Sequence, residues 1–432
     1  MMTTVTFMVQ RAAFRRRGPP WLLLLTLFLL GAFIFGAPSR ATANIFLSTT
    51  PQLILTWSID GTARVWDAAT GTEQLTFKHD AAVRGARWNS DGTRILTWSD
   101  DNTARVWDAT SGDEYFILKH ESGVLGAAWN TDNSQILTWA ADGTVHVWDA
   151  SSGEKRFSPV AEPSPGTYRV GAMWNADESK ILSWVWWFPS SGGNPSGTVH
   201  VWDVAAGKEI WMLPPKMRFG AVWNAAGNHI LVLDIPTVLD AASGEELLTA
   251  KKLRGWLYGA GWNKDESRIS YWMDNGTIHV INASSGTEEL KLRHGQAGSE
   301  VYGVVWNNAA TELMSWSDDD TTRVWDSNTG EERLTLEHDA LVNGASWNSA
   351  ESRILSWSDD GTARVWDAVT GQQSFVLQHD DSVIDAAWNT DESLILTCST
   401  DNTARVWDAA TGQQLSILRH EGFVNGAIWS PR

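Results

Sequence analysis

The chain has 432 residues, a formal net charge of −18 and a single cysteine. One cysteine excludes an internal disulfide framework and a zinc site built from several cysteines. A chain with this much negative charge repels the phosphate backbone of a nucleic acid. We therefore expect no nucleic-acid partner. The length alone allows two or three average domains, unless one unit repeats throughout.

The N-terminal segment, residues 1–43, holds five arginines and no acidic residue. Arg15–Arg17 precede an apolar run, Trp21–Phe35, and an Ala-x-Ala sequence follows at Ala41–Ala43. This order is typical of a secretory signal peptide, with cleavage after Ala43. An uncleaved segment would instead anchor the protein in the membrane. In either case we expect residues 44–432 to be exported, as a periplasmic, extracellular or membrane-anchored domain that meets the membrane only through this segment.

From residue 52 onward one pattern recurs in nine units. Each unit reads approximately V-x-G-A-x-W-N, then I-L-T-W-S-D-D-G-T-A-R-V-W-D, then an apolar stretch that ends in His. The terminal Trp-Asp pair appears in seven units and is altered in two, at Leu239-Asp240 and Ile281-Asn282. The seven pairs begin at Trp66, Trp107, Trp148, Trp202, Trp325, Trp366 and Trp407.

These segments predict β-strands. They are short runs rich in Val, Ile, Thr and Trp, bounded by Asp-Gly, Asp-Asn or Thr-Gly turn signals. In the second unit, Ile95–Ser99 and Thr103–Trp107 are the second and third strands, joined by a turn at Asp100–Asn102. Four strands recur in each unit and no helical periodicity follows residue 43. One such sheet is apolar on both faces, so nine of them must bury one another in a ring or a stack.

The period, the terminal Trp-Asp and the upstream His resemble the WD-repeat (G-beta-like) family over residues 52–429. The resemblance implies an all-β propeller, here with nine four-stranded blades. It also implies a hydrogen-bonded set in each blade, made of the His, an Asp in the second turn, a second-strand hydroxyl and the third-strand Trp, which satisfies buried polar groups. The implied sets are His79, Asp101 and Trp107 (with Thr97 or Ser99); His120, Asp142 and Trp148; His294, Asp319 and Trp325; His338, Asp360 and Trp366; and His379, Asp401 and Trp407.

The two ends of the repeat region are complementary. The first copy lacks a first strand and its His, whereas the C-terminus supplies a His and one strand, Phe423–Trp429. We predict that this strand pairs with Leu53–Trp57 and that His420 joins Asp60 and Trp66, which closes one ring without an unpaired inner edge. The alternative is seven or eight blades with an atypical sector, since most propellers have no more than eight.

The tryptophans are predicted to be structural. Of the 28 Trp residues, 23 occupy three recurring slots on the first, second and third strands. Burial of each indole removes about 150–250 Å² from water, so these side chains predict packing between blades rather than a cofactor site. Cys398 takes the second-strand slot in one unit, which predicts a buried, inert thiol. In the same unit Asp385 replaces the usual first-strand Gly.

One unit departs from the repeat at two connections. It carries an insertion between its second and third strands, ending at Ser190–Gly197, and a long Pro-rich connection, Ser158–Thr167, before its first strand. We expect both loops on one face, with exposed aromatic side chains that bind a partner, unless the insertion folds back onto its own blade. The candidate partner-binding residues are Trp186, Trp187, Phe188 and Tyr168.

No catalytic, cofactor or metal site is predicted. The recurring Asp-Asp pairs lack the ligand spacing of a calcium loop, and Asp is common in turns for local reasons. The chain has no G-x-S-x-G, no Walker loop and no His-Glu-x-x-His. We therefore expect a non-catalytic extracytoplasmic scaffold that binds proteins or glycans through loops on one face. The alternative is a propeller enzyme, a hydrolase or lyase, at the mouth of the central channel, where Asp385 is the one unusual carboxylate.

Overall fold

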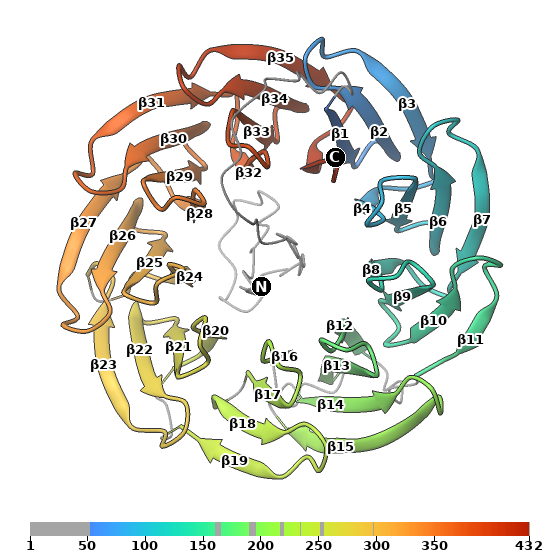
Figure 1. Ribbon diagram of the computed structural model, residues 1–432, viewed down its shortest axis with the longest axis horizontal. Coiled ribbons are helices and arrows are strands. Elements are labelled where there is room, and N and C mark those ends of the chain that lie inside the picture. Colours follow the sequence, from blue (N-terminus) through green and yellow to red (C-terminus); the bar gives the residue numbers. More distant parts are fainter. Residues whose placement is uncertain are drawn as a thin grey trace, which may run out of the picture.

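The computed structural model describes residues 52–159, 166–189, 196–216, 220–233, 235–250, 255–296 and 298–431. Within them, 36 strands form nine four-stranded antiparallel sheets, arranged as blades around one axis (Figure 1). The prediction of an all-β ring with nine blades is confirmed, rather than the seven- or eight-bladed alternative. In this described part of the chain no helix is long and apolar enough to cross a membrane. The predicted signal segment, residues 1–43, lies outside the described residues.

Each blade is read from its innermost strand to its outermost strand. Blades 1 to 3 contain β36 (Val424–Trp429), β1 (Leu53–Ser58), β2 (Thr62–Asp67), β3 (Glu73–Lys78); β4 (Val83–Trp88), β5 (Arg94–Ser99), β6 (Thr103–Asp108), β7 (Glu114–Lys119); and β8 (Val124–Trp129), β9 (Gln135–Ala140), β10 (Val145–Asp149), β11 (Lys155–Phe157). Blades 4 to 6 contain β12 (Gly166–Trp174), β13 (Lys180–Pro189), β14 (Ser196–Asp203), β15 (Lys208–Lys216); β16 (Ala221–Trp223), β17 (His229–Val232), β18 (Thr237–Asp240), β19 (Glu246–Thr249); and β20 (Leu257–Trp262), β21 (Arg268–Met273), β22 (Thr277–Asn282), β23 (Glu288–Arg293). Blades 7 to 9 contain β24 (Val301–Trp306), β25 (Glu312–Ser317), β26 (Thr321–Asp326), β27 (Glu332–Glu337); β28 (Val342–Trp347), β29 (Arg353–Ser358), β30 (Thr362–Asp367), β31 (Gln373–Gln378); and β32 (Val383–Trp388), β33 (Leu394–Ser399), β34 (Thr403–Asp408), β35 (Gln414–Arg419).

The Gly-Ala of the first strand is explained by the Trp of the second strand. Gly85 pairs with Trp98 across the two strands, and a Cβ built on Gly85 would lie 2.0 Å from the indole ring. No side chain fits there, so the indole covers the glycine. The same close approach joins Gly126 to Trp139 and Gly344 to Trp357. The repeat therefore requires Gly and Trp as a pair.

The chain ends build blade 1 together. β36 pairs antiparallel with β1, with Ile54 opposite Trp429 and Leu55 opposite Ile428. The two strands, at opposite ends of the colour scale, lie side by side in Figure 1. Ile54 packs in a cluster with Leu396 of blade 9, whereas Leu55 packs in a cluster with Ile95 of blade 2. Blade 1 thus contacts both neighbours and completes the ring.

The two faces of the ring carry different connections. The entry face is defined here as the face on which innermost strands such as β4 and β20 begin and second strands such as β5 and β13 end; the opposite one is the exit face. On the exit face, Glu178, Glu351 and Glu392 have φ angles of 59°, 55° and 59°. Their carboxylates accept hydrogen bonds from backbone N–H groups of the preceding blade, for example from Ser349 to Glu392. These contacts join adjacent blades and offset the cost of a left-handed backbone.

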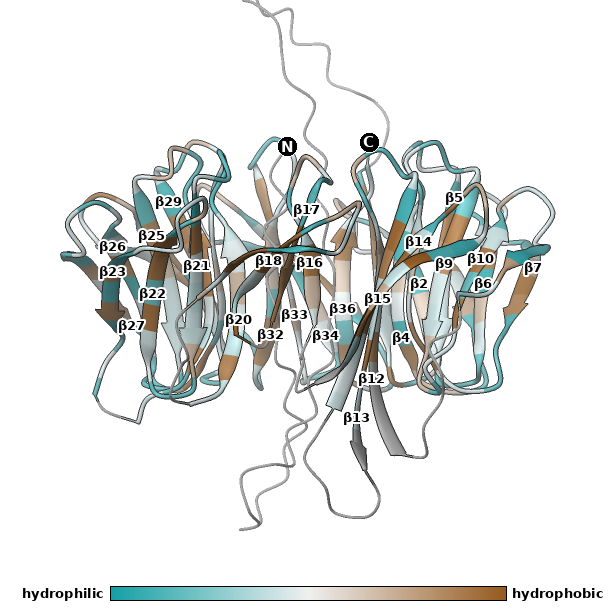
Figure 2. Ribbon diagram, turned by 90° about the horizontal axis from the view of Figure 1, so that it is seen from below, coloured by the Kyte–Doolittle hydropathy of each residue, from teal (hydrophilic) through white to brown (hydrophobic). Residues whose placement is uncertain are grey.

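Blade 4 extends beyond the disc on the entry face. β12 and β13 contain nine and ten residues, whereas most strands contain six. Their pairing continues to Gly166 opposite Pro189, and β13 pairs with β14 as far as Trp187 opposite Ser196. Figure 2 shows the resulting hairpin below the other strands. β12 begins and β13 ends at this end of the blade. The Pro-rich connection before β12 and the insertion after β13 therefore both attach on the entry face, as expected.

Candidate functional site

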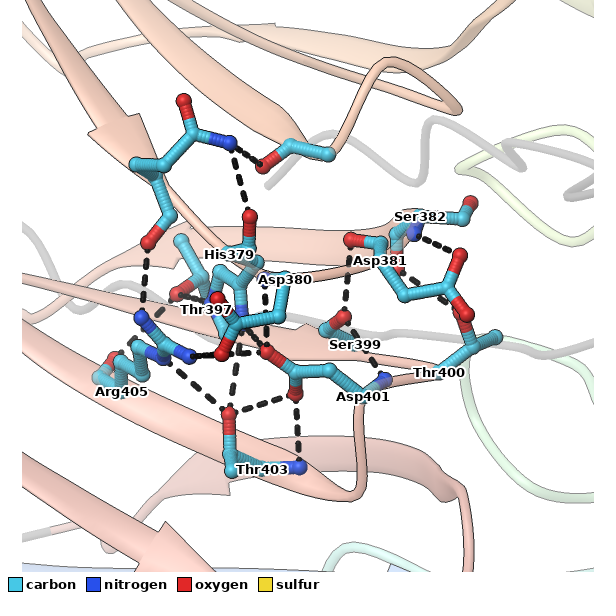
Figure 3. A network of polar contacts seen from close by, with 12 residues as sticks. His379, Asp380, Asp381, Ser382, Thr397, Ser399, Thr400, Asp401, Thr403 and Arg405 are labelled. Carbon is cyan, nitrogen blue, oxygen red and sulfur yellow. Dashed lines mark hydrogen bonds and ion pairs between the residues drawn. The ribbon is translucent and has the colours of Figure 1, made fainter.

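A chain of buried hydrogen bonds runs through blade 9 (Figure 3). Trp407 Nε1 donates to Thr397 Oγ1 at 2.8 Å, and Thr397 Oγ1 lies 2.7 Å from His379 Nε2. His379 Nδ1 lies 2.9 Å from Asp401 Oδ2. Because an indole N–H can only donate, the most consistent order has the threonine donating to Nε2 and Nδ1–H donating to the carboxylate. The indole N–H, the threonine hydroxyl, both imidazole nitrogens and the carboxylate then each have a hydrogen-bond partner.

The network holds Asp401 ionised and His379 neutral. Burial alone would raise the pKa of Asp401, but hydrogen bonds from His379 and Thr403 outweigh it and lower the pKa below its usual value. Arg405 also reaches this carboxylate, at 2.9 Å. Burial lowers the pKa of His379, against the opposing effect of Asp401. The set is therefore locked in one protonation state at neutral pH.

Blades 1, 2 and 8 contain the same arrangement. His420 contacts Thr56 and Asp60, and Trp66 donates to Thr56. In blade 2 the shared hydroxyl belongs to Thr97, whereas Ser99 bonds the Ala81 carbonyl. The other contacts that complete these sets join His79 to Asp101, Trp107 to Thr97, His338 to Ser356 and Asp360, and Trp366 to Ser356.

Blade 3 departs from the expected set. His120 still contacts Thr138, to which Trp148 also donates, but its Nδ1 lies 3.4 Å from Thr144. Asp142 accepts from Thr144 rather than from His120. His146, on the third strand, stacks on His120 at 4.3 Å between ring centroids. Burial, with a smaller contribution from His146, lowers the pKa of His120 to about 3, so this ring is neutral.

Blade 7 contains the set with the imidazole ring reversed. His294 Nδ1 contacts Ser315 at 2.7 Å, and Trp325 donates to the same hydroxyl. His294 Nε2 lies 3.2 Å from Asp319 and 2.9 Å from Thr321. The residues predicted for this blade are brought together, but through opposite ring nitrogens.

Blades 4 and 6 lack the upstream His and place a third-strand His against an outer carboxylate. His200 contacts Glu209 at 2.5 Å, and His279 contacts Glu288 at 2.8 Å. The ring of His279 also stacks on Tyr271, with 4.8 Å between centroids. Within the described ranges, no three or more His, Cys, Asp or Glu side chains are grouped as a metal site would require.

The Ser/Thr, His and Asp of each blade are arranged for stability rather than for hydrolysis. Thr397, for example, is fully buried, and its hydroxyl accepts from Trp407 and serves His379. A nucleophile needs a path to substrate and a free direction of attack. The predicted sets are therefore interpreted as internal supports of the blades.

The aromatic residues predicted to bind a partner occupy strands rather than a loop. Trp186 is only 8% exposed, so the expectation that it contributes exposed surface is wrong. The reason is that β13 pairs on both sides at this level, with Arg169 and with Gly197. Trp187 is partly buried and packs on the cluster between blades 3 and 4. Phe188 and Tyr168 lie in β13 and β12, and their side chains are outside the described part.

Asp385 and Cys398 form a matched exception in blade 9. The two residues are opposite each other in the strand pair, where seven other blades place Gly and Trp and blade 5 places Gly220 and Leu233. Cys398 is 1% exposed, and burial raises its pKa well above the ordinary value. Burial also raises the pKa of Asp385 to about 7. The carboxylate thus lies where an indole would otherwise exclude any side chain.

An exposed aromatic residue on the entry face was not predicted from the sequence. Trp256, directly before β20, is 48% exposed. The available signal was its position outside the three recurring Trp slots. Near it lie Tyr258 and Tyr302, whose rings are 6.3 Å apart.

Comparisons with known proteins agree with the architecture. The model of the family "WD domain, G-beta repeat" matches residues 71–108, 112–149, 330–367 and 371–408. Among solved structures, the crystal structure of a eukaryotic initiation factor is 14% identical, with a TM-score of 0.63, over 89% of this chain and 99% of that chain. The computationally designed Ika8 protein is 20% identical, with a TM-score of 0.57, over 76% of this chain and 97% of that chain.

At these identities the solved structures show the fold alone. A search of curated proteins gives no match. In all, 1757 solved chains match, so the fold by itself does not identify a partner. The four family matches end at the Trp-Asp of blades 2, 3, 8 and 9, where the buried sets are found. The chain therefore contains WD repeats that match this family in four of its blades, and it folds as a nine-bladed β-propeller.

Proposed function

We propose that this protein is a non-catalytic scaffold that binds protein partners through its entry face, outside the cytoplasm. The observation that carries the proposal is the hairpin of blade 4, which extends beyond an otherwise regular disc on that face. The recurring polar side chains, such as Thr397 and His379, hydrogen-bond inside the blades. They therefore leave no recurring group for catalysis. Loops on a rigid support are the usual place for recognition.

Export is proposed from the basic, apolar and Ala-x-Ala order of residues 1–43. N-terminal sequencing of the protein from its native host tests it. A mature chain that starts at Asn44 supports cleavage, and an intact N-terminus in the membrane fraction supports an anchor. Recovery of the intact chain from the cytosol would contradict both.

The scaffold proposal is tested by shortening the hairpin. In the variant, residues 186–197 are replaced by Asp-Asp-Gly, the turn that blade 8 uses at Asp359–Gly361. The control variant changes the equivalent turn of blade 2, Asp100–Asn102, to the same sequence without a change in length. Both should melt as cooperatively as the wild-type protein, as measured by circular dichroism.

Partner capture then discriminates between the variants. We expect cross-linking in the exported fraction, followed by mass spectrometry, to recover the same partners with wild type and control. Their recovery with the shortened variant should fall at least about tenfold, as for the loss of one or two central contacts. Equal recovery with both folded variants would show that the blade 4 hairpin is not the binding site.

A further inference from the structure

Two large apolar side chains are exposed at neighbouring positions on the entry face of blade 1. Ile59, in the turn after β1, is 44% exposed, and Phe423, directly before β36, is 48% exposed. The backbone N–H of Ile59 donates to the Phe423 carbonyl at 3.1 Å. A Cβ built on Gly422 would lie 2.9 Å from Ile59 Cγ1, so the Ile59 side chain packs against the backbone next to Phe423. These two residues are called the apolar pair.

The apolar pair lies on a rigid support. Ser58 Oγ donates to the Gly422 carbonyl at 3.0 Å and accepts from the backbone N–H of Asp60 at 3.1 Å. Asp60 accepts from the backbone N–H of Glu421 at 3.0 Å and belongs to the buried set of blade 1. The two connections that carry the apolar pair are therefore fixed to each other. Little conformational freedom remains to be lost when a partner binds.

Six other blades do not repeat the apolar character of this position. The backbone hydrogen bond between the turn and the residue before the first strand recurs in them, and it identifies the equivalent residues. The turn residue is Asp in four of these blades, and none of the six combines two large apolar residues. The equivalent pairs are Ala82 and Asp100, Gly123 and Ala141, Trp256 and Asp274, Glu300 and Asp318, Leu341 and Asp359, and Ser382 and Thr400. Because these blades fold without such a pair, the apolar pair is not a requirement of the repeat.

Carboxylates flank the apolar pair. Glu421 precedes Phe423 in blade 1, and Asp80 and Asp381 lie in the corresponding connections of blades 2 and 9. All three side chains are exposed, and none forms an ion pair with another described residue. The neighbouring blade is within reach, since the side chain of Asn425 donates to a carbonyl of blade 2 at 3.0 Å. The apolar pair therefore has negative charge on both sides.

The cations of this sector are placed elsewhere. Arg84 pairs with Asp100 at 2.6 Å. Lys78 and Arg419 end the outermost strands β3 and β35, whereas the apolar pair adjoins the two inner strands of blade 1. An apolar centre with an acidic border complements a segment in which cations flank an apolar side chain.

We propose that the apolar pair binds an apolar side chain of a protein partner, in a segment where lysine or arginine residues flank that side chain. The two half-exposed side chains supply the contact that excludes water. Asp80, Asp381 and Glu421 attract the flanking cations. This inference rests on the scaffold function proposed above and adds a second contact on the entry face, three blades from the hairpin of blade 4.

A matched variant removes the apolar pair without a change in charge. Ile59→Thr/Phe423→Ser gives blade 1 the residues that blade 9 has at Thr400 and Ser382, which the repeat already accommodates. The control, Val369→Ala, removes a side chain that is 69% exposed on the exit face. It installs the residue of the corresponding turn in blades 1 and 9. Both variants should melt as the wild-type protein does.

Binding is measured by anisotropy with the full-length protein and three fluorescent hexapeptides, which alternate Lys-Leu, Glu-Leu or Lys-Gly. The Lys-Leu peptide should bind wild type and control equally, and at least about tenfold more weakly to Ile59→Thr/Phe423→Ser. The variant Asp80→Asn/Asp381→Asn/Glu421→Gln should weaken the same peptide about fivefold at low salt and reduce its salt dependence. The Glu-Leu and Lys-Gly peptides should each bind wild type at least about tenfold more weakly than Lys-Leu.

Four results would overturn the proposal. Equal Lys-Leu affinity in the wild type and in Ile59→Thr/Phe423→Ser, with both folded, would mean that the peptide binds elsewhere. Lys-Gly binding as tight as Lys-Leu would mean that overall charge alone is recognised. Glu-Leu binding as tight as Lys-Leu would mean that cations are not selected. A wild-type dimer in sedimentation that is lost in the double variant would mean that a second copy covers the apolar pair.

The same proteins separate this inference from the hairpin proposal. Lys-Leu binding should persist when the blade 4 hairpin is shortened, because the two sites lie in different blades. Loss of partner capture in that variant alone, with peptide binding independent of the apolar pair, would refute this inference and keep the hairpin. Loss of capture with Ile59→Thr/Phe423→Ser but not with the shortened hairpin would refute the hairpin and support the apolar pair.

Discussion

The Asp385–Cys398 pair in blade 9 can be converted to the Gly–Trp pair of blades such as blade 8, and the outcome should be strongly non-additive. In blade 8, a Cβ on Gly344 would lie 2.2 Å from the indole of Trp357. Cys398→Trp alone therefore forces an indole into the space of the Asp385 side chain. Such overpacking costs about 1–3 kcal/mol. Asp385→Gly alone removes the carboxylate but leaves an unfilled space.

The carboxylate itself carries a cost that depends on pH. A rise in pKa from 3.8 to about 7 corresponds to at most about 4 kcal/mol of destabilisation above pH 7. Because Asp385 is partly exposed, solvent reduces this to roughly 2 kcal/mol. The folded state keeps its proton up to higher pH than the unfolded state, so the cost is absent below about pH 4 and complete above about pH 7.

The double variant Asp385→Gly/Cys398→Trp should be more stable than the wild type by about 2 kcal/mol at pH 8, because it removes the charge and fills the slot. It should exceed the sum of the two single effects by about 3 kcal/mol, since the clash disappears with the carboxylate. Urea unfolding followed by circular dichroism measures all four proteins. The reverse exchange in blade 8, Gly344→Asp/Trp357→Cys, is the control and should destabilise. If Cys398→Trp alone is as stable as the double variant, the glycine is not required under the indole, and the packing argument is wrong.

Three further predictions concern the ring, the buried sets and the glycine slot. Deletion of residues 420–432 removes β36 and should broaden thermal unfolding; a sharp, unchanged melt would mean that the ring does not depend on pairing of the chain ends. In the Asp385→Gly background, stability should be full above about pH 7, fall as the pH drops through about 6.5 and fall again below about 4, because His379 and Asp401 both have lowered pKa values in the fold; a melting temperature that is flat from pH 7 to 5 in that background would refute this. Gly344→Ala should cost about 3 kcal/mol, whereas Gly261→Ala, where no atom lies within 4 Å of the new Cβ, should be neutral or slightly stabilising; equal effects in urea unfolding would contradict the slot.

The architecture was predictable from the sequence because each strand is repeated nine times. A single Ile-Leu-Thr-Trp-Ser run is ambiguous, but its recurrence with fixed turn residues is not. The unmatched strand predicted at Phe423–Trp429 also predicted its partner, Leu53–Trp57, since only one first strand was missing. Pairing between distant segments is usually hidden from sequence, and here the repeat revealed it.

The orientation and neighbours of individual side chains were less predictable. Trp186 lies outside the repeat and was expected at the surface, but the longer pairing of β13 buries it. The sequence also places Asp385 and Cys398 thirteen positions apart, and only the register makes them opposite. The contact between Glu392 and the loop of the preceding blade could not be predicted from the recurring Asn-x-x-Glu-Ser sequence alone, because it depends on the distance between two blades.

Blades 4 to 6 are irregular, and the hydrogen-bonded network that makes the other blades regular helps to explain why. The upstream His and the turn Asp both lie at the entry face, where the network also ties the backbone of Asp380 to Asp401. Blades 1, 2, 8 and 9, which keep this network with the same ring orientation, also keep entry-face connections of equal length. Blades 4, 5 and 6 lack the upstream His, and blades 4 and 6 are stabilised from the outer side, through His200–Glu209 and His279–Glu288. Their entry-face loops are released from this network, and blades 4 and 6 are the ones that carry the extended hairpin and Trp256.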